Sequence, residues 1–70
     1  MSDHVYSVSE IVGSSSESIE DAINVALARA RKTLRHLNWF EVTELRGYLT
    51  DEGNVDYYQV ALKLGFRMES

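Results

Sequence analysis

The sequence predicts an α+β fold in which a strand, a helix and two further strands follow one another within 70 residues. Three observations lead to this fold class. Apolar side chains recur at every second position in residues 5–12, and then at three- and four-residue steps in residues 19–37. After residue 38 the spacing returns to every second position, in two stretches separated by the turn sequence DEGN. We therefore expect one domain, residues 1–70, with the order β-α-β-β.

The first strand is expected in residues 4–15. Tyr6 and Val8 alternate there with residues of the opposite face, and the alternation stops at Gly13 and a run of serines, which is typical of a strand end. Glu10 interrupts the apolar series on one face. Part of that face is therefore expected to meet water or a partner chain.

The helix is expected to begin after Ser18, because the sequence SIED from Ser18 to Asp21 fits the capping-box pattern. In that pattern the serine oxygen accepts a hydrogen bond from a free backbone N–H, and the acidic side chain reaches back. The apolar side chains that follow form one stripe on a helix of about five turns. The stripe consists of Ile19, Ala22, Ile23, Ala26, Leu27, Ala30, Leu34 and Leu37.

Charged residues flank this stripe in an order that suits the helix dipole, with acidic residues at the start and basic residues at the end. The acidic residues are Glu17, Glu20 and Asp21, and the basic residues are Arg31, Lys32, Arg35 and His36.

Residues 39–50 and 55–68 are expected to form a hairpin, whose turn contains Gly53 and Asn54, both able to adopt positive φ. The last strand separates into an apolar face and a polar face. The apolar face carries Tyr58, Val60, Leu62, Leu64, Phe66 and Met68, and the polar face carries Tyr57, Gln59, Ala61, Lys63 and Arg67.

A right-handed crossover through the helix makes the first two strands parallel to each other, and the hairpin sets the third strand antiparallel to both. Because the last strand is the most apolar, we expect it in the middle of a three-stranded antiparallel sheet, with the helix over its apolar face. One sheet face and both edges then stay open, and open edges pair readily with other chains. We therefore predict a symmetric assembly of identical chains.

The composition narrows the class of function. Cysteine is absent, which excludes disulfides and thiolate metal sites, and His4 and His36 form no recognisable ligand spacing, so no metal site is expected. A net charge of -4 argues against general nucleic-acid binding. No apolar run approaches the ~20 residues of a membrane span, and the N-terminus does not resemble a secretory signal. A cytoplasmic protein without membrane contact is expected.

Five segments extend over nearly the whole chain in a fixed order: EIVGSS, SIEDAI, ALARARKTLRHLNWFEV, ELRG and YQVALKLGFR. Together they resemble the dodecins, small flavin-binding proteins of bacteria and archaea. The resemblance implies a β-α-β-β chain whose sheet wraps around its helix and which assembles as a hollow homododecamer. This agrees with the element order and with the assembly predicted from the open sheet.

The resemblance also implies a flavin site. In dodecins, paired flavins stack between tryptophans of neighbouring protomers; Trp39 matches that tryptophan, and Gln59 matches the glutamine that hydrogen-bonds the polar edge of the isoalloxazine ring. Arg46 and Arg67 match arginines near the phosphate in FMN-binding bacterial members, which favours FMN over riboflavin and other flavins. The residue types suit these roles, because an indole offers a rigid π-face, a glutamine both a donor and an acceptor, and an arginine a fork that matches phosphate.

The spacing of these residues raises a question. Trp39 and Arg46 are seven positions apart, so they face opposite sides of a regular strand. A bulge, for example at Gly47, or a neighbouring protomer would be needed to bring both to one ligand. Gln59 and Arg67 share a face, which makes a common pocket geometrically feasible.

The basic end of the expected helix has two interpretations. Its charges are either solvated and matched to the helix dipole, or they cluster around a threefold axis and bind a phosphate-bearing molecule such as coenzyme A, which some bacterial dodecins hold. The candidate residues for that second site are Tyr6, Arg29, Lys32, Thr33 and Arg35.

The predicted function is therefore flavin storage or sequestration, in which electron transfer from tryptophan quenches the photochemistry of the bound flavin. A flavin-dependent oxidoreductase and a coenzyme A-binding carrier are the alternatives. An enzyme is not expected, because catalysis needs a positioned acid or base, and Glu41 and Glu44 beside the site are more simply explained as surface carboxylates or salt-bridge partners.

Overall fold

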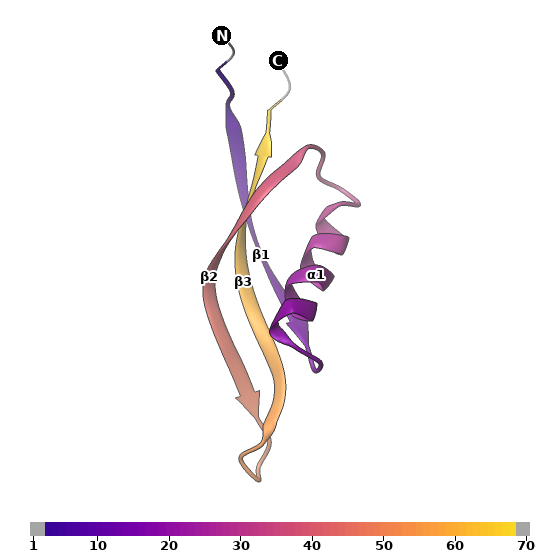
Figure 1. Cartoon of the computed structure of the whole chain (residues 1–70), viewed down its shortest axis with the longest axis vertical. Coiled ribbons are helices and arrows are strands. Elements are labelled where there is room, and N and C mark those ends of the chain that lie inside the picture. The colour runs from indigo at the N-terminus through magenta and orange to yellow at the C-terminus, as the bar shows by residue number, and fades with distance from the viewer. Residues whose placement is uncertain (1–2, 69–70) are drawn as a thin grey trace.

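The computed structural model describes residues 3–68, and its elements follow the predicted order. They are β1 (Tyr6–Ser15), α1 (Ile19–Ala30), β2 (Leu37–Leu49) and β3 (Val55–Arg67). The sheet order is β1-β3-β2, and both outer strands run antiparallel to β3, which confirms that the last strand lies in the middle (Figure 1).

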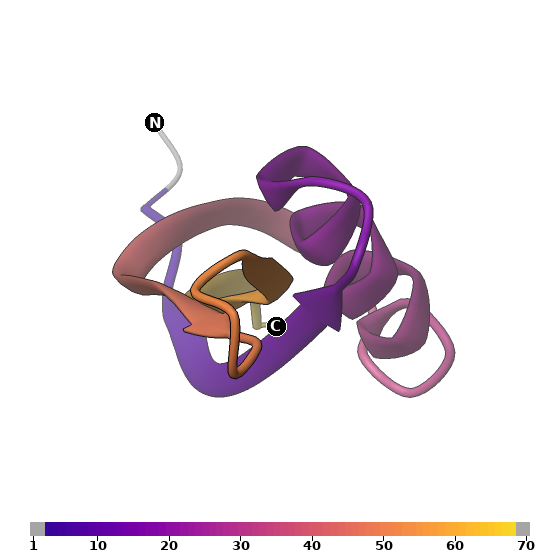
Figure 2. The same ribbon diagram turned by 90° about the horizontal axis from the view of Figure 1, so that it is seen from below.

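The helix covers only part of this sheet. Its backbone approaches β1 and β3 but not β2 among the described residues, and seen along the long axis of the molecule the helix lies against one side of a strongly curved sheet (Figure 2). A helix of 12 residues is about 18 Å long, whereas a strand of 13 residues spans about 43 Å. The hairpin end of β2 and β3 therefore extends well beyond α1 (Figure 1).

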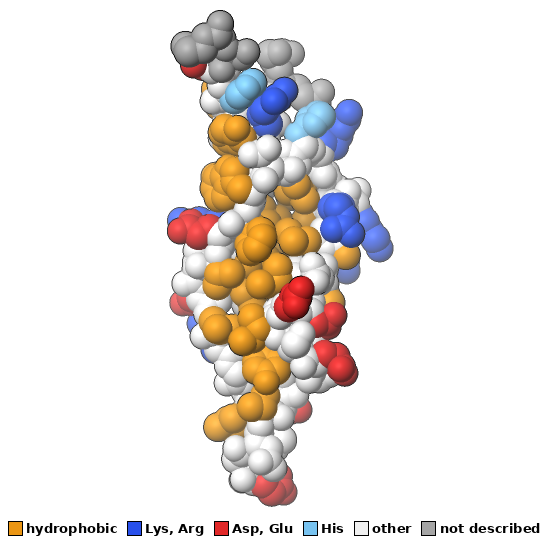
Figure 3. Space-filling model, viewed as in Figure 1, with side chains coloured by type: hydrophobic (Ala, Val, Ile, Leu, Met, Phe, Trp, Pro, Cys, Tyr) orange, Lys and Arg blue, Asp and Glu red, His pale blue; other side chains and the backbone are white. Residues whose placement is uncertain are grey.

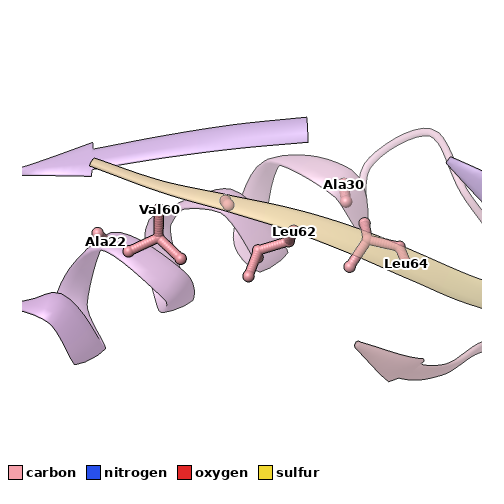
Figure 4. Packing of buried hydrophobic residues seen from close by; sticks show 6 residues of the cluster. Ala22, Ala30, Val60, Leu62 and Leu64 are labelled. Atoms are coloured by element: carbon pink, nitrogen blue, oxygen red, sulfur yellow. The ribbon is translucent and has the colours of Figure 1, made fainter. Parts of the chain in front are cut away.

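The core lies between α1 and the middle strand. Three leucine and valine side chains of β3 are fully buried against three alanines of the helix (Figure 4). These residues are Val60, Leu62 and Leu64, and Ala22, Ala26 and Ala30. Small alanine side chains let the helix approach closely, and the approach is closest at Gly13 of β1, where a Cβ atom would overlap the carbonyl oxygen of Ala22.

The predicted apolar face of β3 is buried only in its centre. Tyr58 and Phe66 are half-buried, and Met68 is 51% exposed because β3 ends at Arg67, one residue earlier. The strand is thus one residue shorter than predicted. The backbone N–H of Met68 still donates to the carbonyl oxygen of Val5, next to the paired residues Tyr6 and Arg67.

The helix begins as predicted, with a modified cap. Ser18 is the N-cap, and its hydroxyl oxygen accepts a hydrogen bond from the backbone N–H of Asp21 at 2.9 Å. The Asp21 carboxylate does not reach back to the Ser18 backbone but accepts from the hydroxyl of Ser15 at 2.6 Å. The same Ser15 oxygen accepts from the backbone N–H groups of Glu17 and Ser18, so the end of β1 and the start of α1 form one network.

The helix ends at Ala30, and the predicted five turns to Leu37 are wrong. The backbone N–H groups of Thr33 and Leu34 both donate to the Ala30 carbonyl, and His36 adopts φ 62°, so the chain leaves the helix and reverses. Leu34 and Leu37 still pack against the core, which is why their spacing continued the apolar stripe. Of the basic residues near this end, Arg29 lies in the last helical turn, whereas most of the others belong to the connection.

The turn between β2 and β3 depends on one glycine. Of the two turn residues able to adopt positive φ, Gly53 does so, with φ 88°, whereas Asn54 does not. Thr50 closes the turn, because its backbone N–H donates to the Asn54 carbonyl and its carbonyl accepts from the Gly53 N–H.

Much of the apolar surface of β2 is exposed. Phe40, Val42 and Leu45 lie opposite the buried residues of β3 and face the same side of the sheet, but they remain largely uncovered. Their side chains are 46%, 44% and 54% exposed. Figure 3 shows apolar side chains gathered in a band along the length of the molecule.

Within residues 3–68, no helix has both the length and the apolar character to cross a membrane.

Candidate functional site

A bulge in β2 resolves the question raised by the spacing of Trp39 and Arg46. Val42 is paired with Leu62 and Glu44 with Ala61, so Thr43 is an extra residue in β2. The Thr43 hydroxyl donates to the Ala61 carbonyl at 3.2 Å. The extra residue shifts the alternation of side chains by one position, so Trp39 and Arg46 point to the same side of the sheet. The bulge lies at Thr43 rather than at Gly47, the position suggested from the sequence.

Because directly paired residues point to the same side of a sheet, the register shows which face each candidate occupies. Trp39 is paired with Gly65, Arg46 with Gln59, and Tyr6 with Arg67. The odd-numbered positions of β3 point away from Val60, Leu62 and Leu64, which face the helix. All four flavin-site candidates therefore lie on the open face of the sheet, the face away from α1.

One chain nevertheless does not bring these four residues to a single point. Gly65, the partner of Trp39, and Gln59, the partner of Arg46, are six positions apart on β3, which corresponds to about 20 Å. Gln59 and Arg67 are eight positions apart on the same strand, or about 27 Å. The open face thus carries two separate groups, Trp39 near Arg67 at one end and Arg46 beside Gln59 toward the other.

The indole of Trp39 lies flat on the sheet. A Cβ atom built on Gly65 would overlap Cε2, Cζ2 and Nε1 of the indole, so the absence of a side chain at Gly65 creates the space for the ring. Gly65 itself is buried, whereas Trp39 stays 40% exposed. The structure therefore supports one side of the ring and leaves apolar surface of the ring available. Sequence reasoning missed Gly65, although a glycine inside an apolar strand often marks such a close approach.

Arg46 forms an ion pair on the open face. Its Nη2 donates to Oε1 of Glu44 at 2.7 Å, with the side chains 48% and 62% exposed. The neighbouring Tyr48 hydroxyl and the Glu44 carboxylate raise the pKa of Arg46 above its usual value. An exposed pair of this kind contributes little to stability, so Arg46 can exchange Glu44 for another anion.

Gln59 is held between the two outer strands. The Tyr48 hydroxyl of β2 donates to Oε1 of Gln59 at 3.2 Å, and Nε2 of Gln59 donates to the Ser14 hydroxyl of β1 at 3.5 Å. The Tyr48 ring is stacked on Tyr57, with ring centroids 4.7 Å apart and an angle of 17° between the rings. Sequence reasoning missed this network, although pairing the two strands across the turn would have placed Tyr48 opposite Tyr57.

The candidate coenzyme A residues do not converge within one chain. Thr33 and Arg35 line a shallow hollow of about 240 Å³ together with His36 and Arg67. The remaining three candidates lie outside this hollow: Arg29 in the last turn of α1, Lys32 in the connection and Tyr6 at the start of β1. Among residues 3–68, no three acidic or histidine side chains lie close enough together to hold a metal ion.

Comparison with known proteins gives one consistent result. The Dodecin family model matches residues 5–69. A curated dodecin from Thermus thermophilus is 60% identical over 65 residues, which are 93% of each chain. The solved dodecin of Streptomyces coelicolor is 51% identical, with a TM-score of 0.90 over 100% of this chain and 99% of that one.

Solved variants of the Thermus thermophilus dodecin are similarly close. A variant with a tryptophan replaced by phenylalanine is 56% identical, with a TM-score of 0.88 over 97% of this chain and 100% of that one. Two further variants each carry an alanine in place of an arginine.

Proposed function

Because the chain belongs to the dodecin family, whose members are small flavin-binding proteins, we propose that it stores flavins by stacking them in pairs between copies of itself. FMN is the proposed ligand, with riboflavin as the nearest alternative. Bound flavin is removed from the free pool and its excited state is quenched. The proposed assembly is a homododecamer.

The observation that carries this proposal is the bulge at Thr43, which turns Arg46 to the sheet face that Trp39, Gln59 and Arg67 also occupy. Since about 20 Å of strand separates Trp39 from Gln59, a flavin that touches both would take them from two different chains. The uncovered apolar surface of β2 supports self-association of this kind, because exposed apolar patches mark interaction surfaces.

Each side chain has a defined role in the proposed site. The exposed surface of the Trp39 indole stacks on the isoalloxazine ring, a contact worth ~1–3 kcal/mol by analogy with base stacking. Gln59 bonds the pyrimidine edge of the ring. Arg46 and Arg67 bind the phosphate of FMN, for which Arg46 exchanges its contact with Glu44.

A flavin titration tests the proposal. Adding the protein freed of ligand to FMN or riboflavin is expected to quench flavin fluorescence, and Trp39→Ala is expected to remove most of the quenching because the stacking surface is lost. Trp39→Phe is the matched control, since it keeps a smaller aromatic face and should quench to an intermediate extent. Equal quenching by the alanine variant would contradict the stacking role.

A coenzyme A carrier is the second candidate, favoured by the hollow that combines Thr33 and Arg35 with Arg67. Coenzyme A should then raise the melting temperature of the protein, and Arg35→Ala should reduce that shift. An unchanged melting temperature at saturating coenzyme A would remove this candidate.

A catalytic role has less support in the geometry. The carboxylate of Glu44, which contacts the candidate phosphate ligand Arg46, is 62% exposed, and no side chain other than Arg46 holds it in place among residues 3–68, so nothing in the chain positions it as a general base. Oxidation of a reductant by the flavin complex at a rate above that of free flavin would support the oxidoreductase instead.

A further inference from the structure

We propose that Tyr48 is a positioning residue, which fixes the side-chain amide of Gln59 so that the amide nitrogen, Nε2, is offered to the ligand. The inference rests on the proposed flavin binding and deepens it, because it specifies which group of Gln59 meets the ring. The ligand edge selected in this way carries a hydrogen-bond acceptor, such as a carbonyl oxygen of the flavin pyrimidine.

The amide of Gln59 has two ends, and each end meets a hydroxyl from a different outer strand. Oε1 accepts from Tyr48 at 3.2 Å, and Nε2 donates to Ser14 at 3.5 Å. The first contact lies within the ordinary range for a hydrogen bond, whereas the second lies at its outer limit. Oε1 is thus held by the stronger contact, whereas Nε2 has only a weak contact to Ser14 and a second N–H, so Nε2 is the group that an incoming ligand can recruit most easily.

Two features fix the direction of the bond from Tyr48. A phenol hydroxyl is a better donor than acceptor, and the neighbouring guanidinium of Arg46 has donors only. The positive charge of Arg46 favours an orientation in which the Tyr48 oxygen faces the guanidinium. The Tyr48 hydrogen is then left for Oε1 of Gln59, which excludes the amide orientation with Nε2 toward Tyr48.

The Tyr48 hydroxyl is itself held in place by its ring. The stacked pair with Tyr57, at 4.7 Å between ring centroids, is formed across β2 and β3 close to the hairpin turn. A tyrosine has few rotatable bonds, so a stacked ring holds its hydroxyl at little entropic cost. The amide of Gln59 is therefore preorganised before any ligand arrives, which reduces the ordering cost of binding.

The test compares two conservative variants of the stacked pair. Tyr48→Phe removes the hydroxyl that bonds Gln59 and keeps the ring, and it should weaken flavin binding by about 3- to 10-fold, as expected for one hydrogen bond. Tyr57→Phe is the matched control, because its hydroxyl has no hydrogen-bond partner among the described residues. It should change the affinity by less than about twofold, the ordinary effect of a surface substitution.

A double-mutant cycle separates positioning of Gln59 from a general structural effect. In a Gln59→Ala background, Tyr48→Phe should add no further loss of affinity, because no amide remains to be oriented. The affinities of the Tyr48→Phe variant for FMN and for riboflavin should fall by the same factor, since the two ligands share the pyrimidine edge. Sizing chromatography and thermal unfolding check that every variant assembles like the original chain.

The outcomes distinguish the inference from the proposed function. If the unsubstituted protein binds flavin but Tyr48→Phe has no effect, or has the same effect with and without Gln59, the inference is wrong and the proposed function stands. If the unsubstituted protein quenches no flavin, the proposed function is wrong, and the role of Tyr48 fails with it.

Discussion

At the scale of single residues, Gly65 of β3 determines where the indole of Trp39 on β2 can lie. Gly65→Ala should displace the indole, because the new Cβ atom would overlap three atoms of the ring. We expect flavin affinity to fall by about tenfold or more, corresponding to the loss of a stacking contact. Fluorescence titration with FMN measures this loss.

The matched control is Gly47→Ala on β2, where the nearest heavy atom to a new Cβ, the Tyr57 carbonyl oxygen, is 3.8 Å away. That variant should bind flavin as the original chain does. Unchanged affinity in Gly65→Ala would mean that the orientation of the indole on the sheet is irrelevant to binding.

The residues of the candidate site could be named from the sequence, but their arrangement could not. Trp39 and Gln59 were identified through the family resemblance, and their positions on strands followed from the alternation of apolar residues. The relation between Trp39 and Arg46 was left open, because the alternation rule assumes an unbroken strand. Threonine is not a residue type that marks a bulge, so only the pairing of β2 with β3 reveals the bulge at Thr43.

At the scale of elements, the close approach of α1 to β1 depends on Gly13. Gly13→Ala should destabilise the fold, because its Cβ atom would overlap the Ala22 carbonyl and lie 2.8 Å from the Ala26 side chain. Overpacking of this kind costs about 1–3 kcal/mol. A lower apparent melting temperature checks the prediction, and Gly47→Ala serves again as the tolerated glycine substitution. Equal melting temperatures for the two variants would contradict it.

The order of the elements was predictable and the end of the helix was not. Strand order followed from connection rules and from the apolar character of β3, and the structure confirms it. The helix end failed because Leu34 and Leu37 contact the same core whether the chain is helical or turns back. Periodicity reports which side chains face the core, and here it cannot separate a continued helix from a reversal at His36.

At the scale of the whole molecule, the exposed apolar face of β2 should be an interface between copies of the chain. Leu45→Glu introduces a charge where the leucine is 54% exposed in the single chain, and it should produce smaller species in sizing chromatography with light scattering. Flavin quenching should fall together with size, because the proposed pocket needs two chains. Asn54→Glu in the exposed turn is the control with the same added charge. An assembly of unchanged size in Leu45→Glu would exclude this face as an interface.

The separation of Trp39 from Gln59 along β3 also has a consequence for regulation. If the proposed flavin pocket is complete only when two chains associate, the number of pockets follows the amount of assembled protein. The apparent affinity for flavin then depends on the concentration of the chain. Dilution would release the ligand, and ligand would in turn favour assembly, since the two equilibria are linked. Under the proposed function, the amount of chain expressed would then set the capacity to retain flavin, without a separate signal acting on the pocket.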